Sequence, residues 1–221
     1  MKILALEFSS EQRSVAVLDD NAGPDSVPVV SATRTSPRTL NAFGLIETTL
    51  RAARLEREQI DCLVVGIGPG SYTGIRAAIS IAQGWQLARP VKLLAISSVE
   101  GLAVHAQAQG ILGFVHILID AQRNEFYIAG YEMKPSALRL VEPLHLATFS
   151  EVSSLAQAGG LLIGPEVDRW FPQARSLFPD AGALARSALG RTDFVLGQTI
   201  EPIYLRKTSF VKAPLPRPPI A

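Results

Sequence analysis

The sequence predicts an α/β protein built from two related halves. It opens with a strand hairpin, the same hairpin theme returns about halfway along the chain, and helical and strand patterns alternate after each hairpin. Asp120 occupies the place in the second hairpin that Glu7 holds in the first, an offset of 120 minus 7, or 113 residues. The hairpin strands are residues 2–8 and 13–19 in the first half and 114–120 and 126–133 in the second.

The remaining elements follow from hydrophobic spacing. In the first half, residues 27–34 predict a third strand and residues 39–54 a helix with one apolar stripe; a nearly continuous apolar run at 61–67 predicts a strand covered on both faces. The stripe of that helix consists of Leu40, Phe43, Ile46 and Leu50. Further along, the patterns predict a helix at 75–88, a strand at 91–97 and a helix at 99–109.

Gly110 and Gly113 mark a break between the halves. The second half then adds predicted strands at 138–147 and 160–164, a helix at 150–158 and short helical pieces across 166–190. We therefore divide the chain into residues 1–109, residues 110–201 as a reduced second half, and a tail of residues 202–221. The tail is rich in proline and basic residues, so it is either a solvated terminus or an arm that touches a phosphate backbone or an acidic partner.

Composition excludes several functional classes. The chain has 221 residues, 48% of them hydrophobic, and 21 Lys plus Arg against 20 Asp plus Glu, so its net charge of +1 offers no global attraction to nucleic acid or membrane. Its single cysteine, Cys62, cannot form an internal disulfide. The apolar run at the N-terminus is too short for a signal peptide, and no run approaches the ~18 residues of a spanning helix. We expect a cytoplasmic protein without membrane contact.

The glycine-rich stretch GIGPGSYTGIR at residues 66–76 is close to a phosphate-binding motif without matching one. Its glycines miss the G-x-G-x-x-G register, no Lys-Ser or Lys-Thr follows them, and no nucleophile elbow fits around Ser71. We expect a tight turn from strand to helix, with Ser71 or Thr73 as the helix cap. A helix N-terminus that binds an anion is the alternative. The residues of the turn are Gly68, Pro69, Gly70, Ser71, Tyr72, Thr73, Gly74 and Arg76.

The helix after this turn has two apolar stripes, and one sheet can cover only one of them. The first stripe is Ile75, Ala78, Ile79 and Ala82, and the second is Ala77, Ile81, Trp85 and Ala88. Small residues, Gly84 among them, leave little bulk to keep another helix away, so we expect a close helix–helix contact, either internal or between subunits. With the stripe of the preceding helix, the candidate interface residues are Leu40, Phe43, Ile46, Leu50, Ala77, Ala78, Ile81, Gly84 and Trp85.

The paired hairpins raise a nucleotide-binding alternative. In actin-like ATPases the hairpin of each half presents a carboxylate to phosphates and magnesium, which makes Glu7 and Asp120 the pair to test, with Ser9 and Ser10 as phosphate donors. An acid at a strand end followed by small polar residues is also an ordinary hairpin. The three histidines stand in separate elements without H-x-x-x-H spacing, so no metal site is expected.

Five segments spread along the chain resemble the TsaB family, also called YeaZ: ILALEFSS, GIGPGSYTGIRAAISIAQG, AISSVEGLA, DAQRNEFY and EPIYLR. The pattern GPGS-aromatic-TG-x-R, with Tyr72 as the aromatic residue, is the most specific of them. The family is the bacterial subunit that makes threonylcarbamoyladenosine in tRNA anticodon loops together with the related TsaD and the ATPase TsaE. The resemblance implies an actin-like, sugar-kinase-like ATPase fold whose second half is reduced.

The resemblance also implies a scaffold role. The family member is regarded as non-catalytic; its helices matching 39–54 and 74–88 pack against TsaD, or against a second copy when TsaD is absent. TsaE and tRNA would then join through the complex, and ATP at the complex would not be turned over by this chain. An ATP-binding transferase or kinase-like enzyme that uses Glu7 and Asp120 remains the alternative.

Three segments depart from the family pattern. Glu7-Phe8-Ser9 replaces the usual Asp-Thr-Ser, and Gln122-Arg123-Asn124-Glu125 replaces the usual Arg-x-Gly-Glu; both changes weaken a phosphate role. Residues 36–39 replace the usual histidine before Leu40, which alters the detail of the partner surface.

Overall fold

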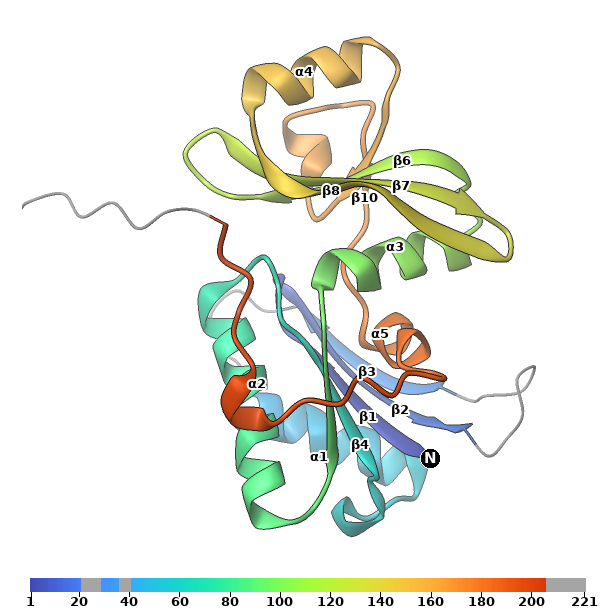
Figure 1. Cartoon of the computed structure of the whole chain (residues 1–221), viewed down its shortest axis with the longest axis vertical. Helices are drawn as coiled ribbons and strands as arrows, with labels where there is room; N and C mark the ends of the chain where they lie inside the picture. Colours follow the sequence, from blue (N-terminus) through green and yellow to red (C-terminus); the bar gives the residue numbers. More distant parts are fainter. Residues whose placement is uncertain (21–28, 36–40, 206–221) are drawn as a thin grey trace, which may run out of the picture.

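The computed structural model describes residues 1–20, 29–35 and 41–205. Two five-stranded mixed sheets are stacked, with helices between them and on both outer faces (Figure 1). Leu40 and most of the predicted tail lie outside the described residues.

The first sheet has the strand order β3-β2-β1-β4-β5. Its hairpin strands pair antiparallel, whereas β1, β4 and β5 run parallel. Because successive side chains of a strand point to opposite faces, Leu4 and Leu6 pack toward α1 and α2, while Ile3 and Ala5 pack toward α5. The strands are β1 (Lys2–Glu7), β2 (Gln12–Asp19), β3 (Val29–Thr35), β4 (Cys62–Gly66) and β5 (Lys92–Ile96).

Two helices cover the outer face of this sheet. They are α1 (Ala42–Ala53), which is followed by the short helix η2 (Arg57–Gln59), and α2 (Tyr72–Ala88). The side chain of Asn41 caps α1 by accepting a hydrogen bond from the Gly44 amide at 3.0 Å. The α2 helix begins three residues earlier than the spacing predicted, because Ser71 caps it through the Gly74 amide at 3.3 Å.

The second sheet repeats the first. Its order is β8-β7-β6-β9-β10, so the antiparallel hairpin with its third strand and the two parallel strands take the same places as in the first sheet. The predicted repeat of two related α/β halves is confirmed. The strands are β6 (Gly113–Asp120), β7 (Glu125–Lys134), β8 (Ala137–Thr148), β9 (Leu161–Gly164) and β10 (Arg175–Ser176).

The helix α3 (Ser98–Ala108) packs on the inner face of the second sheet and α4 (Phe149–Gln157) on its outer face. After η3 (Val167–Arg169) the chain returns to the first half, where α5 (Ala181–Ser187) covers the inner face of the first sheet. The short helix η4 (Gly197–Thr199) then contacts α2. Residues 181–203, which the sequence patterns grouped largely with the second half, therefore lie against the first.

Cys62 belongs to this interior. It is fully buried in β4 among the residues that pack toward α5. Burial raises the pKa of its thiol to about 11, so it is a small apolar strand residue rather than a reactive thiolate.

Candidate functional site

The glycine-rich turn packs directly against the end of β1. Gly68 and Gly70 have φ of 87° and 146°, which other residues rarely adopt. A Cβ at Gly70 would lie 2.1 Å from the carbonyl oxygen of Ser9, and one at Gly74 would lie 2.0 Å from that of Phe8. Glycine is thus required by close backbone approach as well as by conformation.

Three amides of this turn, those of Gly68, Ser71 and Gly74, donate within the chain. The Ser71 amide donates to the Ser9 carbonyl at 2.6 Å, and the Gly74 amide to the Ser71 hydroxyl. Gly68 and Ser98 bond reciprocally, since the Gly68 amide donates to Ser98 Oγ at 3.1 Å and the Ser98 amide to the Gly68 carbonyl at 2.9 Å. This geometry is that of a turn which fixes the starts of α2 and α3 against β1.

Glu7 is fully buried where β1 meets this turn. Its Oε1 accepts a hydrogen bond from the Ser9 amide at 2.8 Å, whereas Oε2 has no hydrogen-bond partner among the described residues. Burial raises the pKa of Glu7, and the nearby hydroxyls of Ser9 and Ser98 oppose that rise. A Cβ at Gly66 would lie 2.2 Å from Oε2, so the carboxyl fills its niche.

Ser9 and Ser10 are buried beside Glu7. The hydroxyl of Ser10 donates to the carbonyl of Gln12 at 2.8 Å, and that of Ser9 has no partner within the described part of the chain. These three nucleotide-site candidates are therefore buried in the protein.

We expect Glu7→Gln to raise the melting temperature by about 3 °C or more near pH 7.5, because the neutral amide keeps the size of the side chain and removes a buried charge, which costs more than a buried neutral polar group. Burial raises the folded-state pKa above the ordinary 4.5. The stability that Glu7 contributes is therefore full below that value and falls as pH rises through the folded pKa. The gain of the variant should grow from acidic to neutral pH.

Melting curves recorded across this pH range test the expectation, with the exposed Glu11→Gln as the matched control. Parallel pH profiles for wild type and Glu7→Gln would show that the carboxyl is already well solvated or paired.

Asp120 is the last residue of β6, as Glu7 is the last residue of β1. Both of its carboxylate oxygens accept hydrogen bonds from the turn that follows. Its Oδ1 accepts a hydrogen bond from the Gln122 amide at 2.7 Å, and its Oδ2 one from the Gln122 side-chain amide at 2.8 Å. Gln122, Arg123 and Asn124 all have positive φ, between 60° and 64°, which favours glycine. Asn124, at the place where the resemblance expects glycine, tolerates that conformation better than most residues.

The α2 helix buries its first stripe and leaves another face open. Ile75, Ala78, Ile79 and Ala82 are buried against the first sheet. The opposite face, formed by Thr73, Arg76, Ser80, Gly84 and Leu87, is exposed. The second stripe lies at its margin, with Ala77, Ile81 and Trp85 half-buried and Ala88 exposed.

The end of this exposed face is apolar. Leu87 is 89% exposed and stands beside Leu196, which precedes η4. Both leucines line a cavity of about 370 Å³ together with Gln83, Gln86, Gly197 and Gln198.

The predicted interface residues of α1 do not share one face. Ile46 and Leu50 are buried with Ala42, Leu45 and Thr49, whereas Phe43 is 68% exposed. Grouping Phe43 with Ile46 and Leu50 was wrong, because the buried face is centred between Leu45 and Ile46 and leaves Phe43 at its edge. Ile46, Leu50 and, on α2, Ala78 are core residues, so a partner can meet Phe43 and Gly84 but not those three.

One surface cluster escaped the sequence patterns. Tyr72 and Arg76 of α2 meet Tyr204, which is 128 residues from Arg76, and the Arg76 Nε donates to the Tyr204 hydroxyl at 3.3 Å. The two tyrosine rings stack with centroids 5.8 Å apart. The sequence drew attention to Tyr204 only through the EPIYLR segment of the family resemblance, which gives no indication of the residues that Tyr204 contacts.

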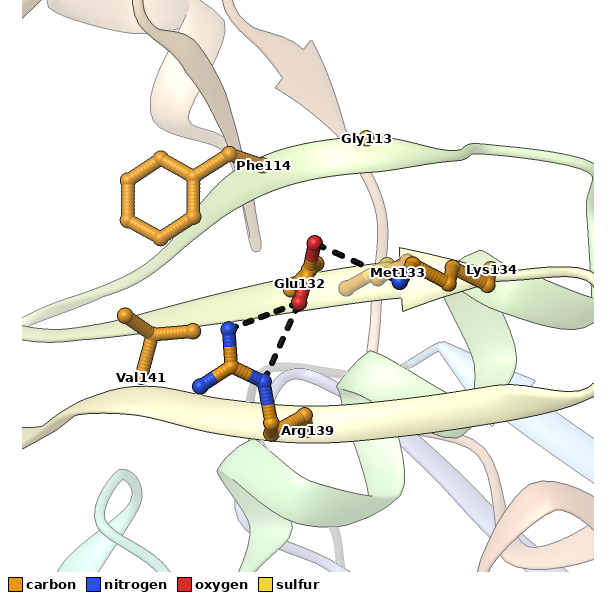
Figure 2. Close-up of a pocket in the computed structure, with 7 residues that line it drawn as sticks. All are labelled: Gly113, Phe114, Glu132, Met133, Lys134, Arg139 and Val141. Carbon is orange, nitrogen blue, oxygen red and sulfur yellow. Dashed lines mark hydrogen bonds and ion pairs between the residues drawn. The ribbon is translucent and has the colours of Figure 1, made fainter.

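A second hollow lies on the second sheet, where its own charges are already paired. Glu132 of β7 accepts hydrogen bonds from Arg139 of β8, the shorter at 2.7 Å, and lies 3.7 Å from Lys134 Nζ (Figure 2). The hydrogen bonds from Arg139 lower the pKa of Glu132. The hollow, about 250 Å³, is lined by Gly113, Phe114, Glu132, Met133, Lys134, Arg139 and Val141. No charged group there is left to hold a ligand by itself.

Among residues 1–20, 29–35 and 41–205, no group of three or more His, Cys, Asp or Glu side chains is arranged to hold a metal ion. No helix in this described part combines the length and apolar character needed to cross a bilayer.

Comparison with known proteins shows which family this chain resembles. Residues 20–198 match the family model described as TsaD: tRNA N6-adenosine threonylcarbamoyltransferase. The chain is 31% identical over 135 residues to the Escherichia coli tRNA threonylcarbamoyladenosine biosynthesis protein TsaB, and 28% identical over 146 residues to that of Bacillus subtilis. These matches cover 60% and 65% of this chain and 55% and 60% of the relatives, so the chain spans less than two thirds of their length.

Solved structures agree along nearly the whole chain. YeaZ from Pseudomonas aeruginosa superposes with a TM-score of 0.77 at 26% identity, over 92% of this chain and 99% of that one. A P. aeruginosa protein described as similar to the peptidase YEAZ superposes equally well at 28% identity, over 93% and 99%. The chain therefore belongs to the family described by the TsaD model and, within it, to the TsaB (YeaZ) proteins.

Proposed function

We propose that this chain is a non-catalytic subunit in the biosynthesis of tRNA threonylcarbamoyladenosine, which docks a TsaD homologue through the exposed faces of α1 and α2. The names of its E. coli and B. subtilis relatives support the assignment to this process. A TsaE homologue and the tRNA then join the resulting complex, and a second copy of the chain takes the same faces when the TsaD homologue is absent.

The exposure of Gly84 carries the docking proposal. Glycine in the interior of an exposed helix costs about 1 kcal/mol relative to alanine. Nothing in the chain lies within 4 Å of a Cβ built at Gly84, so no internal contact requires the missing side chain. Close approach of a partner backbone would require it, and Ser80, one turn earlier, is also small and exposed.

Large exposed apolar side chains on the two helices fit the same role. Phe43 on α1 and Leu87 on α2 are among the most exposed large hydrophobic residues of the described chain. Burial of such side chains against a partner contributes about 1.5–3 kcal/mol each. The two helices thus offer an open position at Gly84 for backbone approach and exposed apolar side chains for burial against a partner.

The assignment as non-catalytic is supported by how the candidate catalytic groups are used. Glu7 and Asp120 each accept hydrogen bonds from their own hairpin, and Ser9 and Ser10 are buried. The amides of the glycine-rich turn that would cradle a phosphate include those of Ser71 and Gly74, which donate within the chain.

Size-exclusion chromatography with light scattering tests this function on the chain alone, its cognate TsaD homologue and their mixture. We expect a one-to-one heterodimer at micromolar concentrations, which replaces any homodimer of this chain. Failure to co-elute would contradict the proposal. If magnesium ATP then raised the melting temperature of the isolated chain and Glu7→Gln abolished that rise, the ATP-binding alternative would replace it.

A further inference from the structure

The cluster of Tyr72, Arg76 and Tyr204 has the properties of a ligand site rather than of packing. The Arg76 guanidinium carbon lies 4.1 Å from the centre of the Tyr72 ring, and Arg76 Nε is hydrogen-bonded to the Tyr204 hydroxyl. The two rings are inclined by only 26°. Tyr72 is 57% exposed and Tyr204 44% exposed, so an ordered stack of two rings and a guanidinium stands in solvent.

The charge of Arg76 is available for an anion. Within the described residues no carboxylate lies at ion-pair distance from the Arg76 guanidinium. Its two contacts are with neutral tyrosines, which orient the guanidinium without neutralising it. A guanidinium held in place and free of a counter-ion is well suited to bind phosphate.

The sequence around the cluster adds positive charge. The chain leaves Tyr204 through Leu205 into Arg206 and Lys207, and the segment 206–221 also contains Lys212 and Arg217 but no Asp or Glu. Four cations therefore follow Tyr204 in the sequence. The net charge of the whole chain is only +1, so this local concentration is a departure from the average.

We propose that this cluster binds an unpaired nucleotide of RNA, whose base stacks on the exposed tyrosine rings while Arg76 takes its phosphate. Aromatic rings beside an arginine are the usual means by which proteins hold single-stranded bases. An acidic protein segment could pair with the positive charge, but it would make no use of the ordered aromatic stack. The inference goes beyond the proposed docking, because it assigns RNA contact to this chain by itself.

Fluorescence anisotropy with the full chain and a labelled single-stranded oligoribonucleotide of about 12 nucleotides tests this site at low salt. We expect saturable binding that Tyr72→Ala with Tyr204→Ala weakens by about tenfold or more. Tyr72→Phe keeps the ring and should bind like wild type. Arg76→Gln should weaken binding and reduce the slope of log affinity against log salt by about one.

Phe114→Ala removes an exposed ring from the second sheet and is the matched control. Because Tyr72 and Tyr204 are largely exposed, their variants should melt within about 2 °C of wild type. A duplex of the same length should bind more weakly than the single strand.

Three outcomes would overturn the proposal. The first is an oligoribonucleotide affinity that the tyrosine and arginine variants leave unchanged. The second is that wild type binds ATP and that the tyrosine and arginine variants lose this ATP binding while they keep RNA binding. This result would assign the cluster to free nucleotides. The third is loss of co-elution with the TsaD homologue with RNA binding intact, which would make the cluster a protein contact. Because Arg76 lies on the exposed face of α2 that a second copy would cover, the RNA assay uses this chain at a concentration where light scattering shows a monomer. Failure of docking to the TsaD homologue would then leave its result standing.

Discussion

Replacing Gly84 with arginine is expected to leave the chain folded and to weaken its complex with a TsaD homologue by at least about 100-fold. The long charged side chain would occupy the strip where the partner backbone approaches, and it would be desolvated there without a counter-ion. The fold should tolerate it, because nothing lies within 4 Å of a Cβ at this position. Helix propensity even favours the variant by up to about 1 kcal/mol.

Titration calorimetry with the TsaD homologue measures the affinity, and the melting temperature measures the fold. Ala108→Arg, at an exposed position near the end of α3, adds the same side chain away from the proposed face and should bind like wild type. A folded Gly84→Arg variant with wild-type affinity would show that this face of α2 does not meet the partner.

A second large effect is expected from a single methyl group in the same helix. Gly74→Ala should lower the free energy of unfolding by about 3 kcal/mol or more, because its Cβ would stand 2.0 Å from the Phe8 carbonyl oxygen. The obstacle is backbone of the segment that follows β1, so no side-chain rotation can relieve it. Gly84→Ala, with open space around its Cβ, should instead raise stability by about 1 kcal/mol.

Urea unfolding of the two variants beside wild type tests the pair. The same chemical change in the same helix should thus act in opposite directions, which separates helix propensity from packing. If Gly74→Ala unfolded like wild type, the glycine-rich turn would not be held against β1, and the sealed state of Glu7 and Ser9 would need to be abandoned.

Local patterns were sufficient for the architecture. Period-two hydrophobicity and the polar turns placed both hairpins within two residues of their observed bounds, and the 113-residue offset between Glu7 and Asp120 predicted the internal repeat that the two sheets show. Alternating hydrophobicity and turn residues are local features, and the repeat is visible when two such local patterns are compared, so the sequence displays them directly.

Faces were harder to predict than elements. Both stripes of α2 are apolar, and periodicity alone could not say that Ala78 would be buried while Ala77 stays at the margin. On α1, Phe43 shares an apolar spacing with Leu50 but projects into solvent. The choice depends on where the sheet lies beneath each helix, and that position results from the packing of the whole first half.

The candidate sites show the same division. The sequence by itself determined the two-halved α/β fold, the strand-to-helix turn at the glycines and the positions of the carboxylates. Only the tertiary structure decided that Glu7 is sealed, that Gly84 faces open space and that Tyr204 meets Tyr72 and Arg76. The physical reason is that burial and contact between residues more than a hundred positions apart are properties of the packed chain, which no local spacing encodes.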